Sequence, residues 1–239
     1  MKKFDKRKKY FLGIDTETTN ALETEEGKLD LSNSLVYDVG WQIIDRRGNV
    51  FLERSYVVAE IFLDTPLMKS AYFAEKIPQY WEDIKAGKRI LTSFLKIRRQ
   101  FLRDRKRFKC QAVFAHNAYF DYNALNTTLR YLTGSKYRYF FPYSCKILDT
   151  LKMARDVIGK SKDYTLFCKE NNYLTNHKTP QNRLTAEILW RYLSGDNEFI
   201  ESHTGLEDVE IESKIFIHCL NAGIKMRRSL FGSNRPSFA

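Results

Sequence analysis

Short apolar runs with the composition of buried strands alternate with stretches of helical periodicity, and this alternation most narrows the choice of fold. Five runs have the strand composition: residues 10–15, 35–45, 50–58, 111–116 and 146–149. The second and third are joined by a turn that contains Gly48-Asn49, which favours an antiparallel hairpin. Helical patterns follow the last two runs. The layout predicts an α/β fold with a mixed five-stranded sheet flanked by helices.

A chain of 239 residues without internal repeats, low-complexity tracts or a linker is expected to form a single domain, 1–239. Its core spans about 10–222. The segment 225–239 is basic and turn-prone, and we expect it to be loosely held. Helical patterns occupy 66–109, 121–132, 150–159, 164–172, 183–194 and 205–222, whereas 21–34 is polar and predicts an exposed loop.

No apolar run approaches the roughly 18 residues needed to span a bilayer, and the charged residues 1–9 are followed by neither the apolar h-region nor the cleavage site of a signal peptide. We therefore expect a cytoplasmic protein with no membrane partner. The cysteines stand far apart without a metal-binding spacing, at Cys110, Cys145, Cys168 and Cys219. This distribution predicts reduced thiols in a core rather than a zinc site.

The net charge of +11 is concentrated between residues 85 and 109, where Asp104 is the only acid. Apolar residues recur there at helical spacing, which predicts a helix with one face packed inward and its cations toward water. Such a surface is either simply solvated or a contact for a polyanion, and both interpretations stay open. In the second interpretation, Arg98, Arg99 and Arg103 contact substrate phosphates.

Asp15 and Glu17 form the first of three acidic motifs that are far apart in the sequence. Side chains two residues apart in a strand point to the same face of the sheet. Two buried carboxylates repel each other and lose hydration, and a bound Mg²⁺ or Mn²⁺ would relieve both effects. A strand that ends in a polar loop is the structural alternative.

Asp121 is the acid of the second motif, and it stands where a helix follows the strand at 111–116. The helix dipole also favours an acid in a first turn, so Asp121 has a structural explanation as well. Asn117 could brace this turn through its side-chain amide. We interpret His116 as a structural histidine.

The third motif covers residues 203–208. Thr204 and Glu207 fit a capping box that opens a helix, which places His203 at N′ and Asp208 at N4. These two positions meet in a hydrophobic staple, but here they carry an imidazole and a carboxylate. If the motifs converge, four carboxylates and one imidazole would form a site for two divalent cations and a general base. Such a site can cut phosphodiester bonds.

Together the motifs resemble the DEDD superfamily of 3′→5′ exonucleases, in its His-containing, DnaQ-like subtype with a ribonuclease-H-like fold. The family pattern is an acid-x-acid on the first strand, an Asn…Phe-Asp segment, and His-x4-Asp near the end. This chain has Asp15-x-Glu17-Thr18-Thr19, Asn117-x-x-Phe120-Asp121 and His203-x4-Asp208. The resemblance spans about residues 10–222.

The resemblance implies a two-metal hydrolysis. Asp15, Glu17, Asp121 and Asp208 would hold two Mg²⁺ ions, with Mn²⁺ as a substitute, and His203 would accept the proton of the attacking water. The expected products are nucleoside 5′-monophosphates released from a 3′ end. The expected substrate contacts are Thr18, Asn117, Tyr119 and Phe120, with Tyr119 a candidate for stacking on a base.

Single-stranded DNA is the expected substrate. An exoribonuclease of the ribonuclease T or oligoribonuclease type is the alternative, because nothing in the sequence distinguishes ribose from deoxyribose. A non-catalytic nucleic-acid-binding module is less favoured, since no motif acid is missing.

The chain departs from the family pattern at Asn20, where a glycine commonly follows Thr-Thr, and in the stretch 173–200, which is longer than the family core needs. The longer stretch puts the expected position of the substrate in doubt more than the expected hydrolysis. In the tail, 229–231 (Ser-Leu-Phe) suggests a docking peptide for a replication or repair partner, with a frayed terminus as the alternative.

Overall fold

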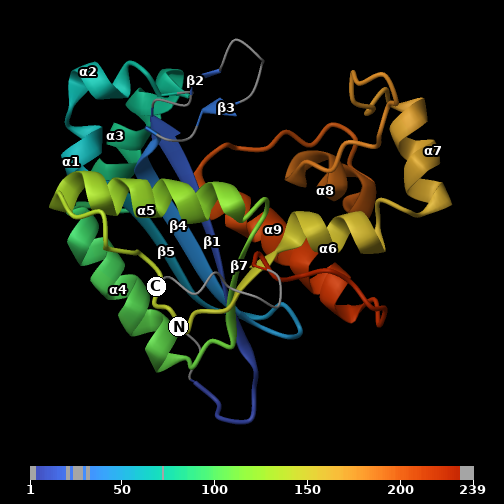
Figure 1. Cartoon of the computed structure of the whole chain (residues 1–239), viewed down its shortest axis with the longest axis horizontal. Coiled ribbons are helices and arrows are strands. Elements are labelled where there is room, and N and C mark those ends of the chain that lie inside the picture. Colours follow the sequence, from blue (N-terminus) through green and yellow to red (C-terminus); the bar gives the residue numbers. More distant parts are fainter. Residues whose placement is uncertain (1–3, 20–21, 24–28, 31–32, 72, 232–239) are drawn as a thin grey trace.

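A six-stranded mixed sheet organises the computed structural model, which describes residues 4–19, 22–23, 29–30, 33–71 and 73–231 (Figure 1). The strand order is β6-β5-β4-β1-β7-β8. Their bounds are β1 Tyr10–Thr19, β4 Leu35–Asp45, β5 Val50–Val58, β6 Ile90–Thr92, β7 Ala112–Ala115 and β8 Ile147–Asp149. The predicted α/β class and hairpin are confirmed, because β4 pairs antiparallel with both β1 and β5.

The predicted count of five strands was wrong by one. Residues 90–92 were assigned to a helical stretch, but they form β6, which pairs in parallel with β5. Ser93 then has an extended backbone and caps α4 (Phe94–Arg107). Three residues are too few to show a strand periodicity beside a long helical pattern.

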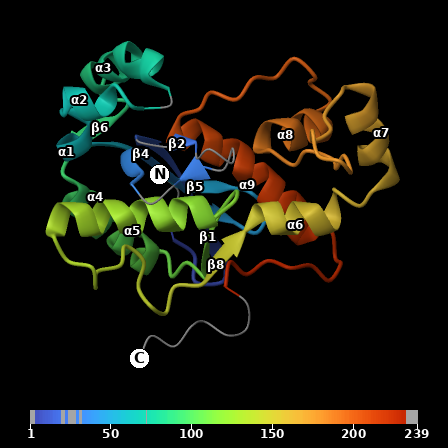
Figure 2. The same cartoon turned by 45° about the horizontal axis from the view of Figure 1, so that its top comes forward.

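The helices cover both faces of the sheet (Figures 1 and 2). On one face, α4 and α5 (Tyr119–Thr133) pack on a core that includes Leu12 and Ile14 of β1. On the other, Phe11 belongs to a second core. Its helices are α6 Thr150–Val157, α7 Lys162–Glu170, α8 Ala186–Ser194 and α9 Gly205–Asn221. The alternation of β1 side chains between the two cores follows from the period of a strand.

Shorter elements complete the architecture. Four of them lie between β5 and β6: α1 Ala59–Phe62, α2 Thr65–Met68, η1 Ala74–Lys76 and α3 Ile77–Lys85. A separate two-stranded sheet of β2 (Leu22–Glu23) and β3 (Leu29–Asp30) lies within the stretch predicted as a loop. Asn20 lies outside the described residues.

The first turn of α9 lies directly against β4, where two glycines meet. A Cβ added at Gly40 would lie 2.2 Å from the backbone nitrogen of Leu206, and one added at Gly205 would lie 2.7 Å from the backbone nitrogen of Gly40. Backbone atoms at such distances leave no room for a side chain, so this approach requires glycine at both positions. It also brings the helix that carries Asp208 onto the strands beside Asp15.

The start of the C-terminal tail is packed, contrary to the expectation of a loosely held segment. Leu230 is 7% exposed, and its backbone nitrogen donates to the carbonyl of Ile147. Phe231 packs edge-on against Tyr122, and Arg227 binds Asp156. Because Leu230 and Phe231 pack on the core, a frayed terminus does not describe this segment, and the docking peptide stays a prediction. Residues 232–239 lie outside the described residues.

All four cysteines are free and buried, as predicted. Within the part of the chain that the structure describes, no helix has the length and apolar character needed to cross a bilayer.

We expect Gly40→Ala to lower the free energy of unfolding by about 1–3 kcal/mol, the usual range for overpacking. It should also weaken Mn²⁺ binding, because the first turn of α9 would move away from β1. Denaturant titration and Mn²⁺ calorimetry measure the two effects. Gly195→Ala is the control for Mn²⁺ binding: its φ of +74° makes alanine unfavourable, so its stability should also fall, but its added Cβ meets nothing within 4 Å and its Mn²⁺ binding should not change. Unchanged Mn²⁺ binding in Gly40→Ala would contradict the proposed role of this contact.

Candidate cation site

Three of the predicted acids form a compact group. Carboxylate oxygens of Asp15, Glu17 and Asp208 lie within 4.8 Å of one another. Asp15 and Glu17 lie within β1 rather than at its end, and Asp208 is N4 of α9. The contact between α9 and β4 explains how residues nearly 200 positions apart meet.

Asp121, the fourth predicted acid, is hydrogen-bonded to β1, the strand that carries Asp15 and Glu17. The hydroxyl of Thr16 donates to Asp121 Oδ1 at 2.9 Å, and Thr16 stands between Asp15 and Glu17. Asp121 lies in the first turn of α5 and is 2% exposed. It lies outside the three-carboxylate group, but its charge raises the pKa of both Asp15 and Glu17. All four predicted acids therefore converge.

Burial and mutual repulsion raise the pKa values of these acids and so favour their protonated forms. Burial is the main cause that raises the pKa of Asp15 and Glu17 well above their ordinary values, and neighbouring carboxylates add to it. Burial likewise raises the pKa of Asp121 and of Asp208 to about 7. Lys76 acts in the opposite direction on Glu17 and Asp208. One lysine does not balance this many acids.

These residues fit a hard divalent cation. The donors are carboxylate oxygens, which Mg²⁺ and Mn²⁺ prefer. A cation among them would replace the lost hydration and remove the repulsion that raises their pKa values. The residues that would hold it are Asp15, Glu17 and Asp208, with Asp121 beside them.

A buried arginine fixes the start of α9. Arg89 is 3% exposed and donates to Asp38 of β4 at 3.1 Å and to both oxygens of Glu207, at 3.1 and 3.2 Å. Asp38 Oδ2 also accepts the backbone N–H of Gly205 at 3.0 Å, which satisfies the first free amide of the helix. Strand and helix are thereby joined at the glycine contact.

The predicted capping box is therefore wrong in its bonds, although Thr204 is the N-cap. The side chain of Thr204 makes no bond to the helix backbone. Its hydroxyl instead donates to the carboxylate of Glu207 at 2.5 Å. Glu207 forms an ion pair with Arg89 and does not bond the backbone N–H of Thr204, the N-cap residue.

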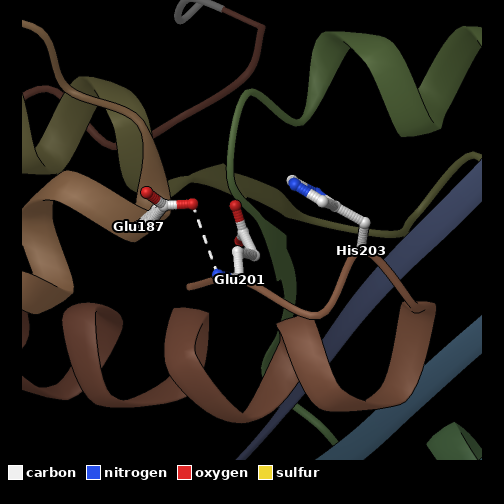
Figure 3. A group of neighbouring side chains, drawn as sticks. All are labelled: Glu187, Glu201 and His203. Carbon is white, nitrogen blue, oxygen red and sulfur yellow. Dashed lines mark hydrogen bonds between the residues drawn. The ribbon is translucent and has the colours of Figure 1, made fainter. Parts of the chain in front are cut away.

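His203 precedes this helix, but its imidazole faces other acids. The ligand atoms of His203, Glu187 and Glu201 lie within 4.8 Å of one another. Figure 3 shows Glu201 and His203 rising from the segment that leads into α9, while Glu187 comes from α8; the backbone nitrogen of Glu201 donates to Glu187 at 3.3 Å. Glu187 also binds Arg191 at 2.6 Å.

The staple-like pairing of His203 with Asp208 is not formed. Asp208 Oδ1 accepts a hydrogen bond from the hydroxyl of Ser202 at 3.1 Å. The imidazole instead stacks on Phe73, with ring centroids 4.4 Å apart. Burial and the nearby Lys76 lower the pKa of His203, so the imidazole is neutral at neutral pH and able to accept a proton.

The predicted substrate contacts differ in accessibility. Tyr119 is 59% exposed and stands at the start of α5, two residues before Asp121. Phe120 is half-buried and Asn117 is exposed. Asn117 braces the turn through its left-handed backbone (φ 56°) and its carbonyl, which accepts the N–H of Phe120, rather than through its amide. The side chain of Thr18 is buried, which argues against contact with a substrate.

The arginines of the basic stretch 85–109 differ in their contacts. Arg89 is committed to the ion pairs described above, and Arg98 donates to the carbonyls of Tyr139 and Phe140 at 3.0 Å. Arg99 and Arg103 are exposed on α4. That helix packs on the sheet face opposite to α9, so it is not adjacent to Asp208.

Three acids near the site were not predicted. Glu187 and Glu201 lie in or beside the longer stretch 173–200, and their approach depends on a loop path that no pattern reveals. Glu212 stands four residues after Asp208 and therefore on the same face of α9, a spacing that was readable in the sequence. His116 is structural, as interpreted, because its Nε2 bonds the carbonyl of Leu184 at 2.7 Å.

No family model and no curated protein matches the sequence. The fold is similar to that of solved nucleases. The nuclease domain of 3′hExo, a DEDDh family member bound to rAMP, has a TM-score of 0.56 and 12% identity over 94% of this chain and 98% of that one. A full-length 3′-exonuclease has a TM-score of 0.57 and 14% identity, with 92% and 85% covered.

Product-bound exonuclease I has a TM-score of 0.53 and 12% identity, with 89% of this chain and 43% of that chain covered. At these identities the likeness concerns the fold. The chain therefore has the ribonuclease-H-like fold of DEDD-type exonucleases, which confirms the fold that the motifs implied.

In cation-free protein we expect stability to fall as the pH rises from about 5 to 8. The pKa values of Asp121 and Asp208 are about 7 in the folded chain and 3.8 ordinarily. Between these values the folded state binds more protons than the unfolded state, so deprotonation favours unfolding. Thermal unfolding in EDTA measures this fall, and Mn²⁺ at pH 8 should reverse it. Asp208→Asn should flatten the profile. A midpoint that rises across this range in the wild type would contradict the account.

Proposed function

We propose that this chain is a divalent-metal-dependent 3′→5′ exonuclease of the DEDD superfamily that releases nucleoside 5′-monophosphates from a nucleic-acid strand. The observation that carries this proposal is the convergence of Asp15, Glu17 and Asp208 within 4.8 Å, with Asp121 beside them. The fold, which is shared with solved 3′-exonucleases, supports the same reading.

The four acids would hold the cations, with Asp15, Glu17 and Asp208 as the compact group and Asp121 beside them. Bound Mg²⁺ or Mn²⁺ supplies stabilisation of negative charge on the attacking and leaving oxygens of a phosphodiester. The chain contributes the fixed positions of the oxygens: Thr16 holds Asp121, and Ser202 holds Asp208.

His203 is the proposed general base. Its lowered pKa leaves the imidazole neutral, and a neutral imidazole can take the proton of a water that attacks phosphorus. Stacking on Phe73 limits the orientations of the ring. Glu187 would stabilise the imidazolium once the proton has moved, since its carboxylate lies within 4.8 Å of the ring nitrogen and acts to raise the pKa of His203.

Single-stranded DNA is the first substrate that we propose, and RNA is the second. The RNA alternative is favoured by two neighbours in fold: 3′hExo was solved with rAMP, and another structure describes recognition of a histone mRNA stem-loop by a 3′-exonuclease. Exposed Tyr119 would stack on a base near the 3′ end, and the exposed cations of α4 would contact phosphates further along the strand.

Labelled oligonucleotides blocked at one end test the activity and its direction. We expect a 5′-blocked single strand to be degraded to mononucleotides, a 3′-blocked strand to survive, and EDTA to stop the reaction. DNA, RNA and duplex DNA are compared in parallel, and faster loss of RNA would favour the second substrate. Degradation of the 3′-blocked strand from its 5′ end would refute the direction. No degradation of any strand with Mg²⁺ or Mn²⁺ would favour a binding module.

We expect His203→Ala to lower the turnover number by about 10²–10⁴-fold, the usual contribution of a general base. The unfolding midpoint and the Mn²⁺ affinity should stay close to those of the wild type, because His203 is absent from the three-carboxylate group. His218→Ala, at an exposed position on the same helix, is the matched control and should keep full activity. Wild-type turnover in His203→Ala would remove the histidine from the mechanism.

A further inference from the structure

A hollow lies at the end of the sheet opposite to the acids. The starts of β1, β7 and β8 bound it on one side, and the segment that follows α9 bounds it on the other. Leu220 of α9 lines the hollow and stands twelve residues after Asp208, which corresponds to about 18 Å along the helix axis. The hollow is therefore separate from the three-carboxylate group.

The hollow has the size and the apolar lining of a small-molecule site. Its volume is about 350 Å³, and such sites commonly measure roughly 300–1,000 Å³. The side chains of Phe11, Ala112 and Leu148 line it and are buried, and Met226 beside them is half-buried. We call these four residues the floor. Apolar and aromatic atoms of this kind suit the face of a ring.

Four cations also line the hollow: Lys9, Arg46, Lys146 and Arg228. All four are exposed. Among the residues that the structure describes, their side chains form no ion pair and no hydrogen bond. Four like charges around one hollow repel each other, and a bound anion would relieve this repulsion.

The acids that adjoin the hollow have other partners. Asp45 accepts a hydrogen bond from Lys8 at 2.7 Å. Asp156 binds the guanidinium of Arg227, which stands between two lining residues, at 2.9 Å. The C-terminus of α9 contributes about half a negative elementary charge. The charge of the four cations is therefore not balanced, and it favours an anionic ligand.

We propose that this hollow binds a nucleoside phosphate, whose phosphate the four cations hold and whose base lies against the floor. Phosphate oxygens accept charge-assisted hydrogen bonds from lysine and arginine. A volume at the lower end of the usual range suits one small molecule rather than a length of strand. The inference goes beyond the proposed function, because it concerns a separate site and requires neither a divalent ion nor hydrolysis.

AMP binding to the whole chain in EDTA tests the proposal, by calorimetry and by nuclear magnetic resonance of the backbone amides. EDTA removes divalent ions, so the acids of the cation site repel the phosphate. We expect AMP to bind more tightly than inorganic phosphate or adenosine, because each of these lacks part of the contacts. Amide shifts should occur at 111–112, 146–148 and 220–228 rather than at 117–121 and 203–208.

The double variant Arg46→Gln/Lys146→Gln should weaken AMP binding by at least about tenfold, since it removes two charged donors. Lys162→Gln/Lys169→Gln is the matched control: it removes the same charge from exposed positions on α7 that do not line the hollow. Met226→Ala should weaken AMP binding and leave the affinity for inorganic phosphate unchanged, because it alters the floor alone.

Wild-type affinity for AMP in the Arg46→Gln/Lys146→Gln chain, or amide shifts confined to 117–121 and 203–208, would overturn the proposal. Inorganic phosphate that binds as tightly as AMP would overturn the assignment to a nucleoside phosphate. A single-stranded oligonucleotide that shifts the amides around the hollow when AMP does not would also overturn it. None of these results bears on the proposed exonuclease, because no motif acid lines the hollow.

Discussion

The ion pairs of buried Arg89 are the interaction on which the arrangement of the site depends. The guanidinium joins Asp38 of β4 to Glu207 of α9, and Asp38 in turn accepts the first amide of that helix. A buried charge is tolerated when it is paired. Two partners of Arg89, Asp38 and Glu207, stand at the junction of strand and helix, and Asp83 of α3 accepts a further hydrogen bond. The contact of Gly40 with Gly205 is held closed by these bonds, and Asp208 is carried to β1 as a result.

The neighbouring acid cluster differs from this junction because its carboxylates form no salt bridge among the described residues. Asp38, Asp83 and Glu207 have Arg89 as a cationic partner, whereas Asp15, Glu17, Asp121 and Asp208 lie together, and Lys76 lowers the pKa of Glu17 and Asp208 without forming a salt bridge to them. Burial and repulsion raise the pKa of each acid, so the cation-free fold carries an unfavourable charge distribution. Because ion pairs hold the junction of β4 and α9 while the neighbouring acids have none among the described residues, the chain can position the acids and still leave them available to a divalent ion.

Much of the fold and the identity of four acids could be predicted from the sequence. Residues 35–45 and 50–58 matched their strands because the Gly-Asn turn fixes a hairpin locally. The sequence could not show that Arg89 is buried, since it lies in a run of cations that reads as solvated surface. The orientation of His203 was also beyond prediction, because it depends on Phe73 and on Glu187, which distant segments supply.

The central claim is that distant acids converge on divalent cations, and anomalous diffraction from Mn²⁺-soaked crystals tests it most directly. We predict an anomalous peak bounded by Asp15, Glu17 and Asp208, with Asp121 beside it. A crystal structure without any peak among these carboxylates, or with Asp208 turned away from β1, would contradict it.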